Sequence, residues 1–149
     1  MFLRSHLSKE FFISVTSFGG PVFYILVILV LLRLRAPFVL TLFLALLFVE
    51  LFCVVIKSVY RKERPISQDR DDFFNKIDAN SFPSVHSARI SVLVTMISLY
   101  YKDVSILIIG IILALCVGYS RIYLKRHYRK DVLAGFLIGV IVAIIAFYI

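Results

Sequence analysis

Long apolar segments, each close to the length that crosses a bilayer, constrain this chain more than any other feature of its sequence. Four of them are uninterrupted: Pro37–Ile56, Val85–Tyr101, Val104–Tyr119 and Val132–Ile149. At about 1.5 Å per residue, each helix would approach the roughly 30 Å hydrocarbon thickness of a membrane. Because 61% of the 149 residues are hydrophobic, little chain is left for a separate soluble domain. We therefore expect an all-α, polytopic membrane helix bundle that forms a single domain over residues 1–149.

One further apolar segment, residues 11–32, is interrupted by a Gly-Gly-Pro sequence that ends at Pro21. Proline suits the first turn of a helix but breaks a helix interior. We expect an interfacial helix from about Leu3 to Phe18, then a break, then a span from Pro21 to about Leu34. A single kinked span from Phe11 is the alternative. Either arrangement gives about five transmembrane helices, and the lack of a small-residue cleavage site predicts that the N-terminus is retained.

The polar loops are distributed unequally between the two membrane faces. Because successive spans alternate in direction, the loops at 57–84 and 120–131 open on the same face as the N-terminus. The other face receives only the short loops at 33–36 and 102–103 and the C-terminus. The net charge of +8 must lie at these surfaces, where it favours anionic lipid head groups or phosphorylated substrates and requires no nucleic acid.

Small residues recur at helical spacing in the last two spans. Such residues let helix backbones approach closely in lipid, so we expect these to pack within one bundle rather than at a dimer interface. They are Gly110, Ala114 and Gly118 in one span and Gly135 and Gly139 in the other.

Three groups of polar residues stand at the span ends that meet on the loop-rich face. Singly, each has an ordinary interpretation, as an interfacial anchor, a helix cap or a helix-surface pair. Together they bring cations, imidazoles, hydroxyls and a carboxylate to the mouth of one bundle. The groups contribute Lys57 and Arg64, then Ser84, Val85, His86 and Ser87, and finally Ser120, Arg121, His127 and Asp131.

These residue types suit a phosphate site. Arginine presents a planar fork to phosphate oxygens, lysine adds a compact charge, and Ser84 would cap a helix whose N-terminal N–H groups attract an anion. If the last helix begins near His127, Asp131 lies on the same face and can fix the tautomer of the imidazole. An imidazole oriented in this way can act as a nucleophile, and His86 can protonate a leaving oxygen.

The combined pattern resembles the signature motifs of the type 2 phosphatidic acid phosphatase superfamily. The motifs are K-x6-R-P from Lys57 to Pro65, P-S-x-H-S from Pro83 to Ser87, and S-R-x5-H-x3-D from Ser120 to Asp131. The resemblance extends from about Gly19 to the C-terminus. The family includes lipid phosphate phosphatases, bacterial phosphatidylglycerophosphate and polyprenyl diphosphate phosphatases, glucose-6-phosphatase and vanadium haloperoxidases.

The resemblance implies a metal-independent, two-step phosphoryl transfer that needs no cofactor. In it, His127 attacks phosphorus to form a phosphohistidine, Asp131 orients His127, and His86 protonates the leaving group. We expect no metal-ligating residues, and assign no function to the two cysteines, Cys53 and Cys116. The residues implied to hold the phosphoryl oxygens are Lys57, Arg64, Ser84 and Arg121, with backbone N–H groups near Val85 and Ser87.

The chain departs from the family pattern at two positions and in its number of spans. Val85 replaces the usual glycine of the second motif, which narrows the backbone approach to phosphate. Arg89 stands one turn into the third span, where the family has small residues, and a charge at that depth needs a partner. Glu50, about two turns below Lys57, is the candidate, and we predict a Glu50–Arg89 ion pair beneath the site. The expected five spans are also fewer than the six common in the family.

The leading interpretation is a membrane lipid phosphatase that removes a terminal phosphate from a lipid substrate. We favour a polyprenyl diphosphate, because a basic cluster could hold a second phosphate or, equally, anchor the helix ends. The alternative substrates are phosphatidylglycerophosphate and phosphatidate. The alternative functions are phosphate transfer to an acceptor alcohol, a metal-dependent prenyl diphosphate enzyme and a non-catalytic binder of anionic lipid. The basic cluster consists of Lys125, Arg126, Arg129 and Lys130.

An acidic loop and the membrane orientation complete the sequence-based expectations. We interpret the acidic loop as a solvated rim rather than a magnesium-diphosphate motif; its carboxylates are Asp69, Asp71, Asp72 and Asp78. We expect a multi-pass protein of the cell membrane, and family resemblance favours an active site on the outer face. The positive-inside tendency favours the cytoplasmic face instead, since only Arg33, Arg35 and Lys102 lie opposite.

Overall fold

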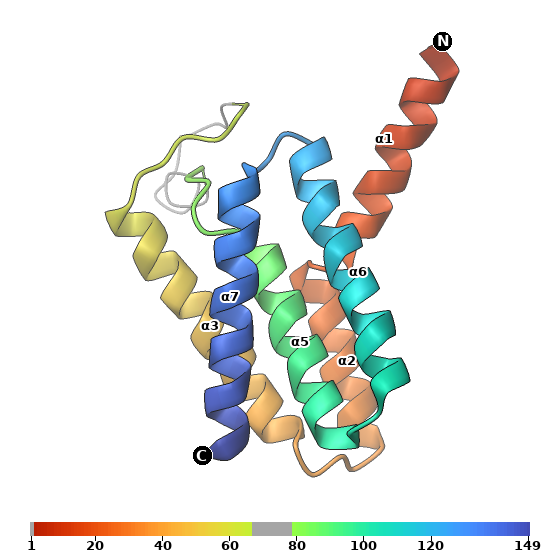
Figure 1. Cartoon of the computed structure of the whole chain (residues 1–149), viewed down its shortest axis with the longest axis vertical. Helices are drawn as coiled ribbons and strands as arrows, with labels where there is room; N and C mark the ends of the chain where they lie inside the picture. The colour runs from red at the N-terminus through yellow and green to blue at the C-terminus, as the bar shows by residue number, and fades with distance from the viewer. Residues whose placement is uncertain (1, 67–78) are drawn as a thin grey trace.

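The computed structural model describes residues 2–66 and 79–149, with side chains from His6 onward. Both ranges are helical with short connections and contain no β-strand, which confirms the all-α prediction (Figure 1). The acidic residues Asp69, Asp71, Asp72 and Asp78 lie outside the described residues. The helices are α1 Phe2–Ser17, α2 Pro21–Arg33, α3 Val39–Val59, α5 Val85–Tyr101, α6 Val104–Tyr123 and α7 Arg129–Tyr148.

The predicted break near the N-terminus is confirmed. α1 ends at Ser17 and α2 begins with Pro21 at its first turn, where proline costs no hydrogen bond. The two helices are bent by 45° at this break. Two boundaries differ from the prediction, because α6 continues to Tyr123 and α7 begins at Arg129, one turn earlier than the apolar run.

Three helices, α3, α6 and α7, are each long and apolar enough to cross a membrane, and α1 with α2 forms a fourth candidate if the bent pair is one span. Helix length and composition alone do not establish the predicted five crossings with an interfacial helix. α5 has 17 residues and carries buried hydroxyl groups, including Ser87 and Ser91. Its neighbours shield it from lipid, so its surface need not be apolar on every side.

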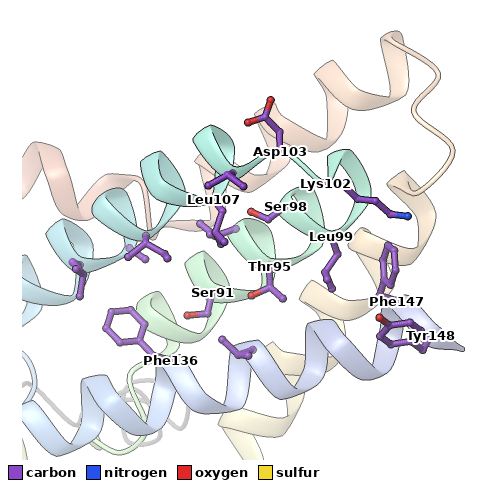
Figure 2. Close-up of a pocket in the computed structure, with 16 residues that line it drawn as sticks. Ser91, Thr95, Ser98, Leu99, Lys102, Asp103, Leu107, Phe136, Phe147 and Tyr148 are labelled. Atoms are coloured by element: carbon purple, nitrogen blue, oxygen red, sulfur yellow. The ribbon is translucent and has the colours of Figure 1, made fainter.

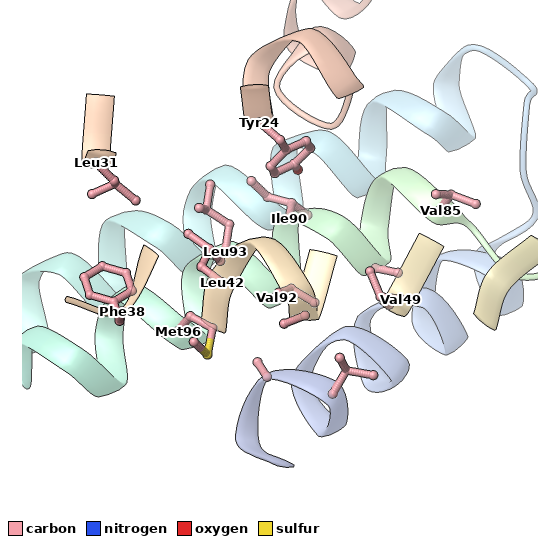
Figure 3. Close-up of a cluster of buried hydrophobic side chains, with 14 of the residues drawn as sticks. Tyr24, Leu31, Phe38, Leu42, Val49, Val85, Ile90, Val92, Leu93 and Met96 are labelled. Atoms are coloured by element: carbon pink, nitrogen blue, oxygen red, sulfur yellow. The ribbon is translucent and has the colours of Figure 1, made fainter. Parts of the chain in front are cut away.

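α5 forms the centre of the bundle, with α3, α6 and α7 packed around it (Figure 1). Leu42 and Val49 of α3 pack with Ile90, Val92 and Met96 of α5, and all five side chains are fully buried (Figure 3). The outward faces of α2, α3, α6 and α7 expose leucine, isoleucine and phenylalanine side chains. This arrangement is that of a helix bundle whose outer surface contacts lipid.

Two glycines allow α7 to lie directly against the start of α5. A Cβ atom at Gly135 would overlap the carbonyl oxygen of Ser84, and one at Gly139 would overlap that of Ala88. Backbone oxygens cannot move aside as a flexible side chain can, so only glycine fits. Together with the contacts of Gly118 against α7, this confirms that the small residues pack within one bundle.

The polar connections gather at one end of the bundle, as predicted. Figure 1 shows residues 60–66 and 79–84, which follow α3 and precede α5, and the α6–α7 connection at the same end as the N-terminus. The α2–α3 and α5–α6 connections and the C-terminus lie at the opposite end. The three motif segments therefore meet at one end of the molecule.

Candidate active site

A small cavity of about 80 Å³ lies at the loop-rich end of the bundle. We call it the phosphate cavity, because residues from all three motifs line it. Six of the predicted site residues line its wall, and Glu50 and Arg89 complete it. The eight lining residues are Glu50, Lys57, Arg64, Val85, His86, Arg89, Arg121 and His127.

The predicted phosphate-binding cations are buried around this cavity. Lys57 is 2% exposed, and Arg64 and Arg121 are each 8% exposed. Removing several positive charges from water is costly unless negative charge compensates them. A multiply charged oxyanion can accept hydrogen bonds from several of these groups at once, which makes the cavity suited to a phosphoryl group.

Hydrogen bonds fix the chain segments that carry these cations. The amide of Asn80 donates to the carbonyl oxygen of Lys57 at 2.9 Å, and Ser81 N donates to that of Lys62 at 2.7 Å. Arg121 donates through one terminal nitrogen to Thr16 Oγ1 of α1, at 3.1 Å. The first helix thus reaches the site, a contribution that no sequence pattern indicated.

The second motif forms the N-terminus of α5, with Ser84 as its cap, as predicted. The Ser84 hydroxyl oxygen accepts from Ser87 N at 3.5 Å and from Ser87 Oγ at 2.9 Å. Both serines are fully buried, and neither lines the phosphate cavity. Val85 and His86 of the first turn do line it, so the positive end of the helix dipole faces the cavity.

His127 is 3% exposed and is held by a backbone carbonyl rather than by a carboxylate. Its Nδ1 lies 2.6 Å from the carbonyl oxygen of Ser81. A carbonyl oxygen can only accept, so Nδ1 carries the proton and Nε2 keeps its lone pair. α7 begins at Arg129, beyond His127, so the expected pairing of His127 with Asp131 on one helix face is wrong.

The environment of His127 keeps its imidazole neutral. Burial lowers its pKa well below the usual value, and the nearby charges of Arg121, Arg64 and Lys57 lower it further. The hydrogen bond to Ser81 opposes this shift. The Nε2 lone pair of a neutral imidazole is available for nucleophilic attack near neutral pH.

Asp131 instead joins the start of α7 to the segment after α3. Its Oδ1 lies 2.5 Å from Lys62 Nζ, and its Oδ2 accepts from Tyr128 N at 2.9 Å. The Lys62 ammonium also lies 4.7 Å from the centre of the Tyr128 ring. Asp131 thus holds Tyr128, the residue that follows His127, and Lys62 of the segment after α3. Sequence reasoning missed Lys62, because the sequence does not distinguish it from its cationic neighbour Arg61 as a partner for Asp131.

The predicted Glu50–Arg89 ion pair is confirmed. Arg89 Nε donates to Glu50 Oε2 at 2.6 Å, and a terminal nitrogen of Arg89 lies 2.5 Å from the same oxygen. The other terminal nitrogen donates to the carbonyl oxygen of Gly19 at 3.3 Å. The pair lines the wall of the phosphate cavity.

Two larger spaces adjoin the phosphate cavity. A basic basin of about 740 Å³ shares His127 with it, and is also lined by Lys62, Lys125, Arg129 and Lys130. An apolar groove of about 420 Å³ between α2 and α3 shares Glu50 and Arg89 with it. The phosphate cavity therefore adjoins a basin lined by cationic side chains and a groove lined mainly by apolar ones.

The cavity of about 760 Å³ between α5, α6 and α7 is remote from this chemistry. Figure 2 shows Ser91, Thr95 and Ser98 of α5 facing it, with Phe136 and Tyr148 of α7. No motif residue lines it. Within residues 2–66 and 79–149, no three His, Cys, Asp or Glu side chains gather in a metal-ligating group.

Comparisons with known proteins agree with the geometry. Residues 38–149 match the PAP2 superfamily. A stretch of 69 residues, 46% of the chain, is 41% identical to the bacitracin transport permease protein BcrC of Bacillus licheniformis, but spans only 33% of that protein.

Two solved structures share the fold. A PAP2-type phosphatidylglycerolphosphate phosphatase from Bacillus subtilis has a TM-score of 0.79 and 22% identity, and the match covers 94% of this chain and 75% of that chain. LpxE of Aquifex aeolicus has a TM-score of 0.82 and 26% identity, over 96% of this chain and 87% of that chain.

The Lys62–Asp131 pair should contribute measurably to stability. We expect Lys62→Met to lower the Tm in detergent, because it leaves a buried carboxylate without its cation. A coupling of about 0.5–3 kcal/mol is typical of residues in one ionic network, and each kcal/mol corresponds to about 2–4 °C in a chain of this size. Thermal unfolding of Lys62→Met, Asp131→Asn and the double variant measures the coupling free energy between the two side chains.

Arg61→Met is the matched control, since Arg61 is exposed and should have little effect on the Tm. The interpretation fails if Lys62→Met lowers the Tm equally in the wild-type and Asp131→Asn backgrounds, because additivity would mean that the two side chains are not coupled.

Proposed function

Because the chain belongs to the PAP2 superfamily, which includes membrane lipid phosphatases, we propose that it is a membrane lipid phosphatase that acts through a phosphohistidine at His127. The family is the one that the three motifs predicted from the sequence. The proposed reaction removes the terminal phosphate from a lipid phosphate and releases inorganic phosphate.

The position of the phosphate cavity between the basin and the groove is the observation that carries this proposal. An apolar groove that reaches the cavity at Glu50 and Arg89 suits the chain of a lipid. The basin on the other side, reached at His127, suits the release of a hydrophilic product. A soluble phosphate ester would need only the second of these two spaces.

In the first step, Nε2 of His127 attacks the terminal phosphorus. A P–N bond forms, the P–O bond to the leaving group breaks, and the electron pair of that bond goes to the leaving oxygen. His86 gives this oxygen a proton, so the dephosphorylated lipid leaves. Lys57, Arg64 and Arg121 stabilise the charge on the phosphoryl oxygens, with preorganised donors that need not reorient during the reaction.

In the second step, water takes the place of the departed lipid. His86, now neutral, accepts a proton from the water as its oxygen attacks phosphorus. The P–N bond breaks, its electron pair returns to the imidazole of His127, and inorganic phosphate is released. The proton stays on Nδ1, which donates to the Ser81 carbonyl oxygen throughout and keeps the imidazole in one tautomer.

The substrate that we favour is a polyprenyl diphosphate. The density of cations at the cavity supports a highly charged head group, and the apolar groove supports a lipid chain. We further propose that the chain crosses the cell membrane about five times, with α2 and α5 as crossings in addition to α3, α6 and α7. The family resemblance supports an active site on the outer face.

The proposed function predicts metal-independent release of inorganic phosphate from a lipid phosphate. The purified protein in detergent, with a chelator present, should release phosphate from polyprenyl diphosphate, phosphatidylglycerophosphate or phosphatidate. His127→Ala should abolish release, because it removes the nucleophile. Loss of one member of such a catalytic unit typically costs about 10⁴-fold or more in rate.

The identity of the preferred lipid would settle the substrate class. Release that requires magnesium, or that persists in His127→Ala, would contradict the histidine mechanism. No release from any of the three lipids would favour a binder of anionic lipid over a phosphatase.

The low pKa of His127 predicts the pH profile of kcat/KM. His127 must be neutral to attack, so on the acidic side activity falls as the pH drops through its lowered pKa, and this limb lies below the ordinary value of about 6.5. Arg121→Gln removes the cation with the largest effect, so the limb should move to higher pH.

The wild type and Arg121→Gln act on the same substrate, so ionisation of the substrate affects both pH profiles equally. The difference between the two profiles therefore reports the pKa of the His127 imidazole. An acidic limb that stays at the same pH in Arg121→Gln would show that His127 does not set it.

A further inference from the structure

We propose that Arg89, held in place by Glu50, binds the phosphate of the leaving group, so that the enzyme selects lipid diphosphates over lipid monophosphates. This inference rests on the proposed function and names the substrate class for that site. It gives the Glu50–Arg89 pair a role in specificity, beyond holding α3 and α5 together.

Arg89 occupies the junction between the phosphate cavity and the apolar groove. It lines both spaces, as does Glu50. Of the described residues that line the groove, Arg89 is the only cation, and the other lining side chains apart from Glu50 are apolar or tyrosine. A charged group that follows the reacting phosphoryl group toward the lipid chain would therefore meet Arg89.

The order of groups along α5 supports this placement. His86 and Arg89 are three residues apart, so they share a helix face, with Arg89 one turn deeper in the bundle. Gly19 brings the α1–α2 break against both: a Cβ there would lie 2.8 Å from His86 Cβ, and its carbonyl accepts from Arg89. The proton donor and the buried guanidinium therefore lie in sequence along one wall.

In-line displacement then fixes which side the leaving group occupies. The attacking and leaving atoms lie on opposite sides of phosphorus in phosphoryl transfer. His127 lines the phosphate cavity where it meets the basin, and Glu50 and Arg89 line it where it meets the groove. We therefore infer that the leaving group faces Glu50 and Arg89. From a diphosphate, that leaving group is a lipid monophosphate, whose developing negative charge Arg89 would stabilise.

A monophosphate substrate would make no such use of Arg89. Its leaving atom is an alcohol oxygen, which His86 protonates, and the next atoms toward the groove are carbon. An arginine that is only 14% exposed in its side chain would then face uncharged substrate. The geometry thus favours a diphosphate at this wall.

Glu50 explains how the guanidinium is kept in the bundle before substrate arrives. A single oxygen, Oε2, accepts from both Nε and one terminal nitrogen of Arg89. Arginine carries five N–H groups, so donors remain on its terminal nitrogens for a phosphate oxygen. Glu50 thus compensates the buried positive charge of Arg89 without using all of its N–H donors.

With Arg89 at the leaving group, the second phosphate of a diphosphate substrate lies away from the basic cluster. Lys125, Arg129 and Lys130 line the basin, on the same side of the phosphate cavity as the nucleophile. In an in-line reaction they face away from the leaving group. The second phosphate therefore belongs at Arg89, not at the basic cluster.

The test compares two substrates of the same chain length, a polyprenyl diphosphate and the corresponding monophosphate. The measured quantity is the ratio of their kcat/KM values, from which a general loss of activity cancels. We expect the wild type to favour the diphosphate, and the Glu50→Gln/Arg89→Gln variant to reduce the ratio about 10- to 100-fold, as expected for the loss of a charged hydrogen bond. The double substitution avoids leaving either charge buried alone.

Arg129→Gln is the matched control, because it removes a guanidinium from the basin side, and its ratio should equal that of the wild type. Arg89→Lys keeps the ion pair but loses the planar fork, so it should lower the ratio even if the double variant does not fold. An unchanged ratio in the Arg89 variants, or a wild type that prefers the monophosphate, would overturn the role of Arg89. A wild type that acts on neither polyprenyl lipid but does act on phosphatidate would also overturn the selection for diphosphates, whereas no release from any lipid phosphate would contradict the proposed function instead.

Discussion

The concentration of positive charge inside one end of a membrane bundle is the constraint on which the rest of the structure depends. Lys57, Arg64 and Arg121 are nearly excluded from solvent and face one small cavity. Hydrogen bonds fix the segments that carry them, such as those from Asn80 to the Lys57 carbonyl and from Arg121 to Thr16. The glycine contacts of α7 against α5 serve this purpose, since they bring the His127 loop against the N-terminus of α5.

The same charges determine the chemistry of His127. They lower its pKa together with burial, and the Ser81 carbonyl fixes which nitrogen carries the proton. Buried positive charges and the positive end of a helix both repel a further cation and stabilise a phosphoryl group. In the proposed reaction, the groove at Arg89 would receive the lipid product and the basin at His127 would receive inorganic phosphate.

Much of the fold and of the site could be predicted from the sequence. Hydrophobic runs located the helices to within a turn, and motif spacing located the residues that line the cavity. The Glu50–Arg89 pair was predictable because a charge within an apolar helix requires a partner. The roles of Ser81 and Lys62 were not, because a backbone carbonyl has no sequence signature and one loop lysine resembles another. The Asp131 pairing failed because helix α7 begins two residues after His127, a boundary that apolar periodicity cannot define.

Rapid quenching during turnover tests the central claim most directly. The enzyme would be mixed with a lipid diphosphate labelled in its terminal phosphate, quenched in alkali, digested and mapped by mass spectrometry. The geometry predicts an acid-labile, base-stable phosphate on Nε2 of His127, formed and lost at rates consistent with turnover and absent from His127→Ala. Turnover without a labelled protein, or a label on Nδ1 or on another residue, would contradict the phosphohistidine mechanism.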